Sequence, residues 1–300
     1  MALTGNWRLG LALAATTATL WGLLPIALKG LLNAVDPYTV TFFRFFFSAL
    51  ALLPWVLLRG ELPGRAQLKP RNTLLLLFAS VFLCANYIGY QLGLNRITPE
   101  AAQVTIQAAP MLLLLAGIWL FDEPFTLRQW LSAALFVAGL GLFFHHRLFE
   151  VFSDVSHYGT GIWIILLAAA LWTGYAILQK MMVGQFSAQF SMLVFCSIGS
   201  MVFAVPADFS TLAALNSQQW LLLIFAGANT LIAYGAFAEA LNHTEASRVS
   251  AILTLTPLIT VSVVHLFPFP GVVVEPLDEL SLVGALMVVL GSMGAALLRR

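Results

Sequence analysis

Polar side chains four positions apart interrupt two of the long apolar segments of this chain. Residues at this spacing lie on one face of a helix. Because a polar face in hydrocarbon needs hydrogen-bonding partners, we expect these faces to point inward and to line a binding cavity. Hydrogen bonds between helices, each worth about 0.6 kcal/mol, are the alternative role. The pairs are Asn86 with Tyr90, Tyr87 with Gln91, and Gln103 with Gln107.

Two tryptophans lie near the middle of apolar segments, whereas tryptophan usually gathers at the membrane interface. The positions of Trp21 and Trp172 predict a cavity wall that encloses an apolar or aromatic ligand, or a cation through the ring faces. Ordinary helix packing is the alternative for each ring. The other residues expected at this cavity are Tyr87, Tyr90, Tyr175, Tyr234 and Thr254, the last being the repeat equivalent of Gln107.

Charged and metal-binding residues within the segments are few. Arg44 lies about two helical turns into its segment. Its candidate roles are an anchor that extends to the interface or pairs with Asp36, and a contact for a substrate carboxylate. None of the 13 acidic residues falls clearly at the centre of a segment, so no carboxylate proton relay is predicted. His145, His146 and His157 lack a helical ligand spacing, and no metal site is predicted.

The composition places the chain in a membrane. Hydrophobic residues make up 60% of the chain and charged residues 9%, against about 25% charged in soluble domains. A net charge of +1 provides no basic surface for nucleic acid. No paired carboxylates, no Ser or Cys beside a base and no ligand cluster stand out. We therefore predict neither an enzyme nor a cofactor, and name the lipid bilayer and a small molecule as partners.

Ten apolar segments each approach the ~20 residues that cross a bilayer as a helix. Runs of this length are too long for the strands of a membrane barrel. The sequence therefore predicts an all-α integral membrane protein with ten transmembrane helices. The segments are residues 9–31, 38–58, 73–94, 101–121, 127–144, 160–182, 188–206, 218–241, 247–267 and 280–298.

The second half of the chain repeats the first. Four sets of matches in one order predict two domains, residues 1–150 and 151–300, with five helices each. The prolines within the repeat lack a backbone donor, so Pro110 and Pro257 are predicted to act as matched hinges. The matches are Trp21 and Lys29 with Trp172 and Lys180; Tyr87 with Tyr234; Asn95 and Pro110 with Asn242 and Pro257; and Glu123-Pro124 and Gly139 with Glu275-Pro276 and Gly291.

The basic residues that flank the segments predict the orientation. With the N-terminus inside, ten lie on the cytoplasmic side and three outside, and the even number of spans places both termini in the cytoplasm. Five spans in each half make the two repeats inverted. The cytoplasmic set is Arg8, Arg59, Arg65, Lys69, Arg71, Arg128, Lys180, Arg248, Arg299 and Arg300, and the outer set is Lys29, Arg96 and Arg147.

Several of these motifs resemble the drug/metabolite transporter superfamily, and within it the ten-helix EamA-type carriers. The resemblance covers nearly the whole chain and rests on the early tryptophans, the mid-helix prolines, the Glu-Pro pairs that lead into Gly-rich segments, and Arg44-Phe45. The second half departs from the pattern at Phe195, where the alignment with Arg44 would place a basic residue. The resemblance implies a secondary carrier of small organic molecules, often an exporter of amino acids or related metabolites.

The sequence thus predicts a secondary transporter in the inner membrane that works by alternating access. Segments 1, 3, 4, 6, 8 and 9 are expected to enclose its substrate site, with segments 5 and 10 as scaffold. Three substrate classes fit the sequence: hydrophobic or aromatic amino acids, purine-like metabolites and amphipathic toxic compounds. Amino acids are favoured because a zwitterion suits amide side chains beside aromatic walls. A channel or a non-transporting membrane scaffold is the alternative, and the sequence makes no prediction of oligomeric state.

Overall fold

The computed structural model describes residues 6–64, 67–121, 126–152, 156–182, 184–267 and 269–298. Within these ranges the chain is all helical, with no strand. The helices in chain order are α1 (Trp7–Leu32), α2 (Pro37–Arg59), α3 (Pro70–Leu94), α4 (Pro99–Ile106), α5 (Ala108–Phe121), α6 (Leu127–Phe143), η1 (His145–Arg147), α7 (Leu148–Phe152), α8 (His157–Met181), α9 (Ala188–Ala204), η2 (Phe209–Ala214), α10 (Ser217–His243), α11 (Ala246–Leu253), α12 (Thr256–Leu266) and α13 (Glu279–Leu297).

The helices account for the ten predicted spans. Among the described residues, eight spans are long and apolar enough to cross a membrane, counting α4 with α5 and α11 with α12. The ninth is α6, which continues through a bend of 61° into η1 and α7. The tenth, α9, is apolar but has only 17 residues. The fold is therefore an all-α membrane bundle, as the segment lengths predicted.

Polar residues at the helix ends explain where several spans begin. The side chain of Asp36 accepts hydrogen bonds from two backbone N–H groups at the start of α2. Thr98 caps α4 in the same way, and Thr126 and Asn216 form capping boxes with the glutamines three positions later. These contacts satisfy donors that a helix leaves free at its N-terminus. Gly60 ends α2 with a positive φ of 65°.

The fourth and ninth spans are each broken, and the two breaks are equivalent in the repeat. One lies at Gln107, between α4 and α5, and the other at Thr254 and Leu255, between α11 and α12. Pro110 and Pro257 follow directly, and each removes the N–H that would bond to the carbonyl four residues earlier. The breaks therefore lie where the sequence predicted hinges, while hinge motion stays a prediction.

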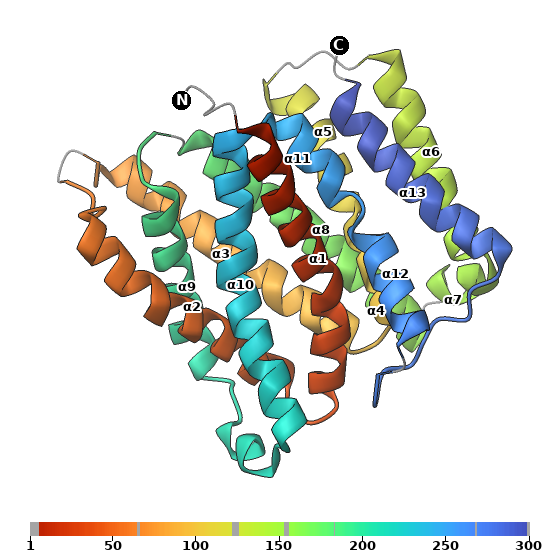
Figure 1. Ribbon diagram of the computed structural model, residues 1–300, viewed down its shortest axis with the longest axis horizontal. Helices are drawn as coiled ribbons and strands as arrows, with labels where there is room; N and C mark the ends of the chain where they lie inside the picture. Colours follow the sequence, from red (N-terminus) through yellow and green to blue (C-terminus); the bar gives the residue numbers. More distant parts are fainter. Residues whose placement is uncertain are drawn as a thin grey trace.

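The helix packing follows the internal repeat. The most extensive contacts join α1 with α10, α3 with α8, α2 with α9 and α6 with α13 (Figure 1). In the repeat, α1 corresponds to α8 and α3 to α10, so the first two pairs are equivalent. The other two pairs each join a helix to its own repeat equivalent. Because α1 and α8 start at opposite ends of the bundle, the two five-helix repeats are inverted. The Glu123-Pro124 half of the last repeat match lies outside the described residues.

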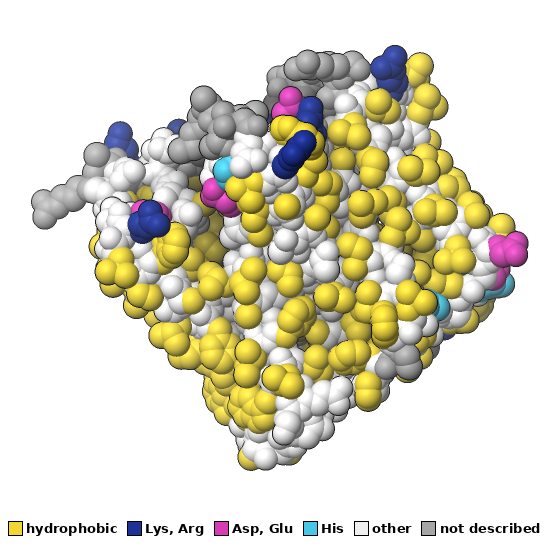
Figure 2. Space-filling view, viewed as in Figure 1, with side chains coloured by type: hydrophobic (Ala, Val, Ile, Leu, Met, Phe, Trp, Pro, Cys, Tyr) yellow, Lys and Arg dark blue, Asp and Glu magenta, His cyan; other side chains and the backbone are white. Residues whose placement is uncertain are grey.

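The two chain ends lie at the same end of the bundle, which we call the termini face (Figure 1). In Figure 2, hydrophobic side chains cover the visible flank, while Lys and Arg gather along the edge at the termini face. Such a flank suits lipid, since exposed apolar patches of this extent are rare in soluble monomers. The described basic residues at this face are Arg8, Arg59, Lys69, Arg71, Arg128, Lys180 and Arg248. Arg65, Arg299 and Arg300 lie outside the described residues.

Candidate functional site

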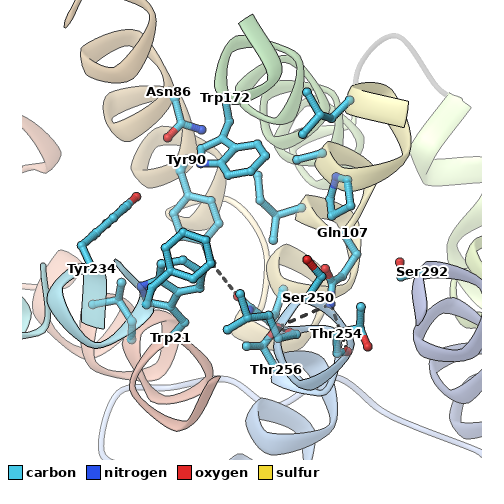
Figure 3. Close-up of a pocket in the computed structure, with 18 of the residues that line it drawn as sticks. Trp21, Asn86, Tyr90, Gln107, Trp172, Tyr234, Ser250, Thr254, Thr256 and Ser292 are labelled. Carbon is cyan, nitrogen blue, oxygen red and sulfur yellow. Dashed lines mark hydrogen bonds between the residues drawn. The ribbon is translucent and has the colours of Figure 1, made fainter. Parts of the chain in front are cut away.

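A cavity of about 490 Å³ lies at the centre of the bundle, between the two repeats (Figure 3). This volume falls within the range of small-molecule sites. Eleven of the predicted site residues line it: Trp21, Arg44, Asn86, Tyr87, Tyr90, Gln103, Gln107, Pro110, Trp172, Tyr234 and Thr254.

The aromatic walls come from both halves of the chain. Trp21 on α1 meets the Tyr234 ring on α10 edge-to-face, with 5.3 Å between centroids. Figure 3 shows Trp21, Tyr90 and Tyr234 gathered on one side of the cavity, with Gln107, Ser250 and Thr254 on the other. Trp172 from α8 adds a further ring. The cavity thus offers an apolar side and a hydrogen-bonding side to one ligand.

The hydrogen-bonding side is built around the two helix breaks. Gln107 lies at the first break, and its Nε2 donates to the Thr254 carbonyl at 3.1 Å and the Thr256 hydroxyl at 3.5 Å, both at the second. The Tyr90 hydroxyl donates to Gln103 Oε1 at 3.2 Å. Broken helices leave backbone groups that can be satisfied where they face a cavity. Gln107 therefore couples the matched breaks of the two repeats at the site itself.

Arg44 is buried in the cavity wall, with 4% of its surface exposed. Its Nε donates to the Thr230 hydroxyl at 3.2 Å, and its guanidinium lies over the Tyr87 ring at 4.6 Å. No carboxylate in the described part of the chain lies within ion-pair distance of it. Asp36 instead caps α2 and bonds to Thr39. Thus the pair with Asp36, predicted as one role of Arg44, is absent from the described structure.

Three predicted residues do not line the cavity. The Gln91 amide donates to the Thr41 hydroxyl on α2, so it joins two helices. Tyr175 packs edge-to-face on Phe195, in a hydrophobic cluster with α9. Pro257 is buried one residue beyond the lining residue Thr256. The structure assigns the first two to packing.

The cavity also includes residues that the sequence patterns missed. Asn229 on α10 donates to the Leu20 carbonyl at 2.7 Å, while its buried Oδ1 has no partner in the described structure. Ser292 on α13 likewise has an unpartnered buried hydroxyl. Arg44 and Ser292 bring α2 and α13 to the cavity, so the site extends beyond the six segments expected to enclose it. An amide within an apolar helix, Asn229, was the available signal.

The cavity extends towards the termini face. Its lining includes Ala246 and Ser247 in the first turn of α11, and Ala296 near the end of α13. A buried network lies at the opposite end of the bundle, around Glu275, which has 5% of its surface exposed. Thr98 and Tyr158 donate to Glu275 Oε2 at 2.8 and 3.0 Å.

Two further contacts complete the Glu275 network. Arg147 Nε donates to Glu275 Oε1 at 2.6 Å, and the Glu275 backbone N–H donates to the buried Glu100 carboxylate at 3.1 Å. Nearby, Lys29 donates to the carbonyls of Leu94 and Asn95 at the end of α3. The network therefore joins α4, α8, η1 and the segment before α13 across both repeats.

A sequence model of the EamA-like transporter family matches this chain twice, over residues 8–144 and 159–297. The chain belongs to the EamA-like transporter family. The two matches coincide with the two inverted repeats, and the family is one of membrane transporters, consistent with a non-enzymatic role. The division at residue 150 falls between the matches and stays a prediction.

Curated relatives of this EamA-like chain carry transporter names. An uncharacterized transporter of Haemophilus influenzae is 33% identical over 292 residues, covering 96% of this chain and 95% of the relative. The uncharacterized inner membrane transporter YhbE of Escherichia coli K12 is 34% identical over 296 residues, covering 96% and 91%. A solved crystal structure matches with a TM-score of 0.68 at 16% identity, covering 97% of this chain and 98% of that chain. This last likeness shows the fold alone.

Proposed function

We propose that this transporter exports amino acids or related small organic metabolites across the inner membrane by alternating access. Its central cavity is the substrate site, and the substrate carries a carboxylate that binds Arg44. The observation that carries this proposal is the burial of Arg44 in the cavity wall without a carboxylate from the described chain.

The energetics of a buried charge support a substrate anion. A guanidinium inside a membrane protein is costly unless it is paired or hydrogen-bonded. In Arg44, one nitrogen donates to Thr230 and the plane of the group rests on Tyr87, which leaves further donors in the fork. A guanidinium binds a carboxylate through two parallel hydrogen bonds. A substrate carboxylate therefore supplies the negative charge that pairs with Arg44, because no carboxylate of the described chain does so.

The remaining lining favours an amphipathic molecule over a highly charged one. Trp21, Trp172 and Tyr234 offer ring faces and edges to an apolar or aromatic side chain, or to an ammonium group. Gln103 and Gln107 offer amides that both donate and accept. The cavity is about 490 Å³, room enough for a single amino acid.

The inverted repeats support alternating access. Basic residues gather at the termini face, so we assign this face to the cytoplasm, with both termini inside. The cavity extends to that face, while the Glu275 network closes the other. We therefore assign the described conformation as inward-facing. Rocking one repeat against the other, with the breaks at Gln107 and Thr254 as hinges, would expose the same site to the outside.

The test is counterflow in proteoliposomes. Vesicles are preloaded with a mixed panel of unlabelled amino acids and other metabolites, and uptake of a labelled member is followed over time. A carrier gives saturable uptake that depends on the preloaded substrate. Flux that neither saturates nor responds to preloading would contradict the proposal and indicate a channel, and no flux with any class would indicate a scaffold.

Variants locate the site within the same assay. Gln107→Ala and Trp21→Ala should both lose exchange, because each removes one side of the cavity. Trp119→Ala is the matched control, since Trp119 is 85% exposed on the bundle surface and does not line the cavity. Exchange that persists in both cavity variants would still indicate a carrier, but it would exclude this cavity as the substrate site.

A further inference from the structure

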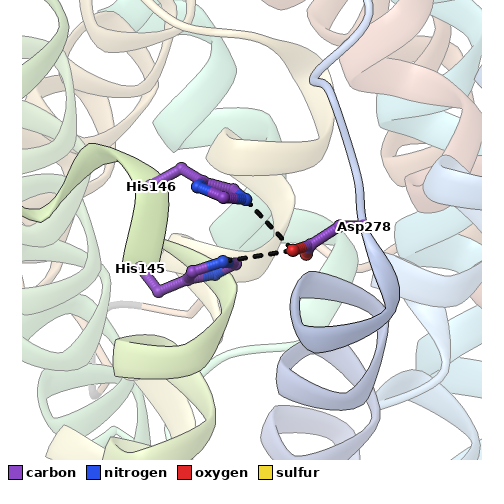
Figure 4. A group of neighbouring side chains, drawn as sticks. All are labelled: His145, His146 and Asp278. Atoms are coloured by element: carbon purple, nitrogen blue, oxygen red, sulfur yellow. Dashed lines mark hydrogen bonds and ion pairs between the residues drawn. The ribbon is translucent and has the colours of Figure 1, made fainter.

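Two histidines and one carboxylate converge on the face opposite the chain ends, away from the cavity. His145 and His146 follow α6, and Asp278 directly precedes α13 (Figure 4). The Nε2 atoms of His145 and His146 lie 3.2 and 3.0 Å from the same oxygen, Asp278 Oδ2. The spacing of the histidines in the sequence predicted no metal site here. Asp278 lies 132 positions after His146, so a search for local ligand spacing does not find it.

The hydrogen bonding of His145 fixes which of its nitrogens carries a proton. Its Nδ1 lies 2.7 Å from the Leu142 carbonyl oxygen. A carbonyl only accepts, so Nδ1–H must be the donor. In neutral His145, Nε2 then has a lone pair and no hydrogen, and this atom lies 3.2 Å from Asp278 Oδ2. The arrangement is the one in which a backbone carbonyl orients a metal-binding histidine.

Asp278 presents a negative charge to these nitrogens. The backbone N–H of Ser281 donates to its Oδ1 at 2.8 Å, and this bond, with lesser contributions from His146 and His145, holds the pKa of the carboxyl below its usual range. A lone pair and a carboxylate oxygen 3.2 Å apart repel each other. A metal ion between them removes this repulsion.

The spacing of the three ligand atoms fits a metal ion. Zinc bonds of about 2.0–2.2 Å place neighbouring ligands of a tetrahedral site about 3.3 Å apart. The two nitrogen–oxygen distances are close to this value, and all three ligand atoms lie within 4.8 Å of one another. The side chains of His146 and Asp278 are 62% and 42% exposed, so an ion has access from solvent and water can supply a fourth ligand.

We propose that His145, His146 and Asp278 bind a divalent transition metal of the zinc class. Imidazole and carboxylate ligands suit this class of ion better than calcium or magnesium, which prefer oxygen alone. The metal would link the end of the first repeat to the start of the last span. Asp278 lies three residues after Glu275, so the ion would also hold the segment that closes this face. This site is independent of the transported substrate.

Metal binding to the purified full-length chain tests the proposal. Protein in detergent, free of any histidine tag and stripped with a chelator, is titrated with Zn²⁺ near pH 7.5 by calorimetry. We expect one Zn²⁺ per chain, with affinity at least tenfold weaker in His146→Ala and in Asp278→Asn. Asparagine also caps helices, so the second variant preserves the start of α13. His157→Ala, an exposed histidine outside the cluster, should bind as the unmodified chain does.

A second readout separates coordination from a nonspecific effect. Co²⁺ in place of Zn²⁺ should give the visible absorption of a tetrahedral site in the unmodified chain and in His157→Ala, and lose it in His145→Ala and His146→Ala. The absence of any Zn²⁺ binding would overturn the proposal and leave the cluster as a set of polar contacts within the protein alone. Equal binding in Asp278→Asn, His146→Ala and the unmodified chain would overturn it as well.

Discussion

Arg44 lies with its guanidinium 4.6 Å from the centre of the Tyr87 ring, and both side chains line the central cavity. Tyr87 in turn stacks on Phe45, with 4.6 Å between centroids. The face of the Tyr87 ring thus stabilises the positive charge of Arg44, while the remaining N–H donors of the guanidinium are free for a ligand. The symmetry of the repeat is broken here, because the position equivalent to Arg44 is Phe195, which packs on Tyr175.

Replacing Arg44 with glutamine should weaken substrate binding about 10- to 100-fold, because hydrogen bonds to a charged group contribute about 1.5–3 kcal/mol. The measurement is the half-saturating substrate concentration in counterflow. Arg44→Lys should recover only part of the affinity, since an ammonium lacks the two-pronged geometry. Arg59→Gln is the control on the same helix, because Arg59 lies at the helix end beside Trp55. An unchanged affinity in Arg44→Gln would remove Arg44 from the substrate site.

Restoring the backbone donors at the helix breaks should slow transport. In Pro110→Ala and Pro257→Ala, the new N–H can bond to the carbonyl four residues earlier and straighten the span. We expect a several-fold lower maximal exchange rate, with substrate affinity retained. Pro54→Ala serves as the control, because Pro54 lies within α2 and outside the cavity. Rates equal to that of the control in both variants would show that the breaks do not act as hinges.

Glu275→Gln should destabilise the closed opposite face. The glutamine preserves the volume but removes the negative charge that accepts from Arg147, at a cost of about 1.5–3 kcal/mol. The melting temperature of the protein in detergent should therefore fall. Glu279→Gln is the matched control, since Glu279 is exposed in the first turn of α13. A melting temperature no lower than that of the control would mean that the network does not stabilise this conformation.

Two glycines on α6 should respond oppositely to alanine. A Cβ on Gly139 would lie 2.7 Å from the Val288 backbone nitrogen on α13, whereas a Cβ on Gly141 would meet nothing within 4 Å. Gly139→Ala should therefore destabilise the fold by about 1–3 kcal/mol through overpacking. Gly141→Ala should stabilise it by up to about 1 kcal/mol, because alanine is the better helix former.

Thermal unfolding in detergent measures both variants. Equal melting temperatures for Gly139→Ala and Gly141→Ala would show that α6 and α13 can move apart without loss of stability. Loss of stability in Gly141→Ala instead would contradict the open space that the structure shows for a Cβ at this position.

The helical architecture could be predicted from the sequence because the bilayer restricts what a spanning segment can be. A span must be long, apolar and helical, so segment length and hydropathy located the helices. The matched prolines marked both breaks because a missing N–H acts locally. What the patterns did not show is the bend of 61° after Phe143, because no proline or glycine marks residues 144–148.

Only part of the candidate site could be predicted from the sequence. Side chains four apart on α3 and α4 marked two polar faces, but Tyr90 and Gln91 differ in direction by about 100° around the helix. The first lines the cavity and the second bonds to Thr41 on α2. Asn229 and Ser292 lie in runs rich in small residues, and the rotation of their helices decides where they point. The Asp278 cluster likewise depends on how α6 and α13 pack.

Competition in counterflow tests the central claim most directly. An aromatic amino acid and its carboxamide, which lacks the carboxylate, compete with a labelled amino acid exchanged by the unmodified chain and by Arg44→Gln. We predict that the carboxamide competes at least tenfold more weakly than the acid in the unmodified chain, and that Arg44→Gln abolishes this difference. Equal competition by the acid and the carboxamide in the unmodified chain would contradict a carboxylate bound to Arg44.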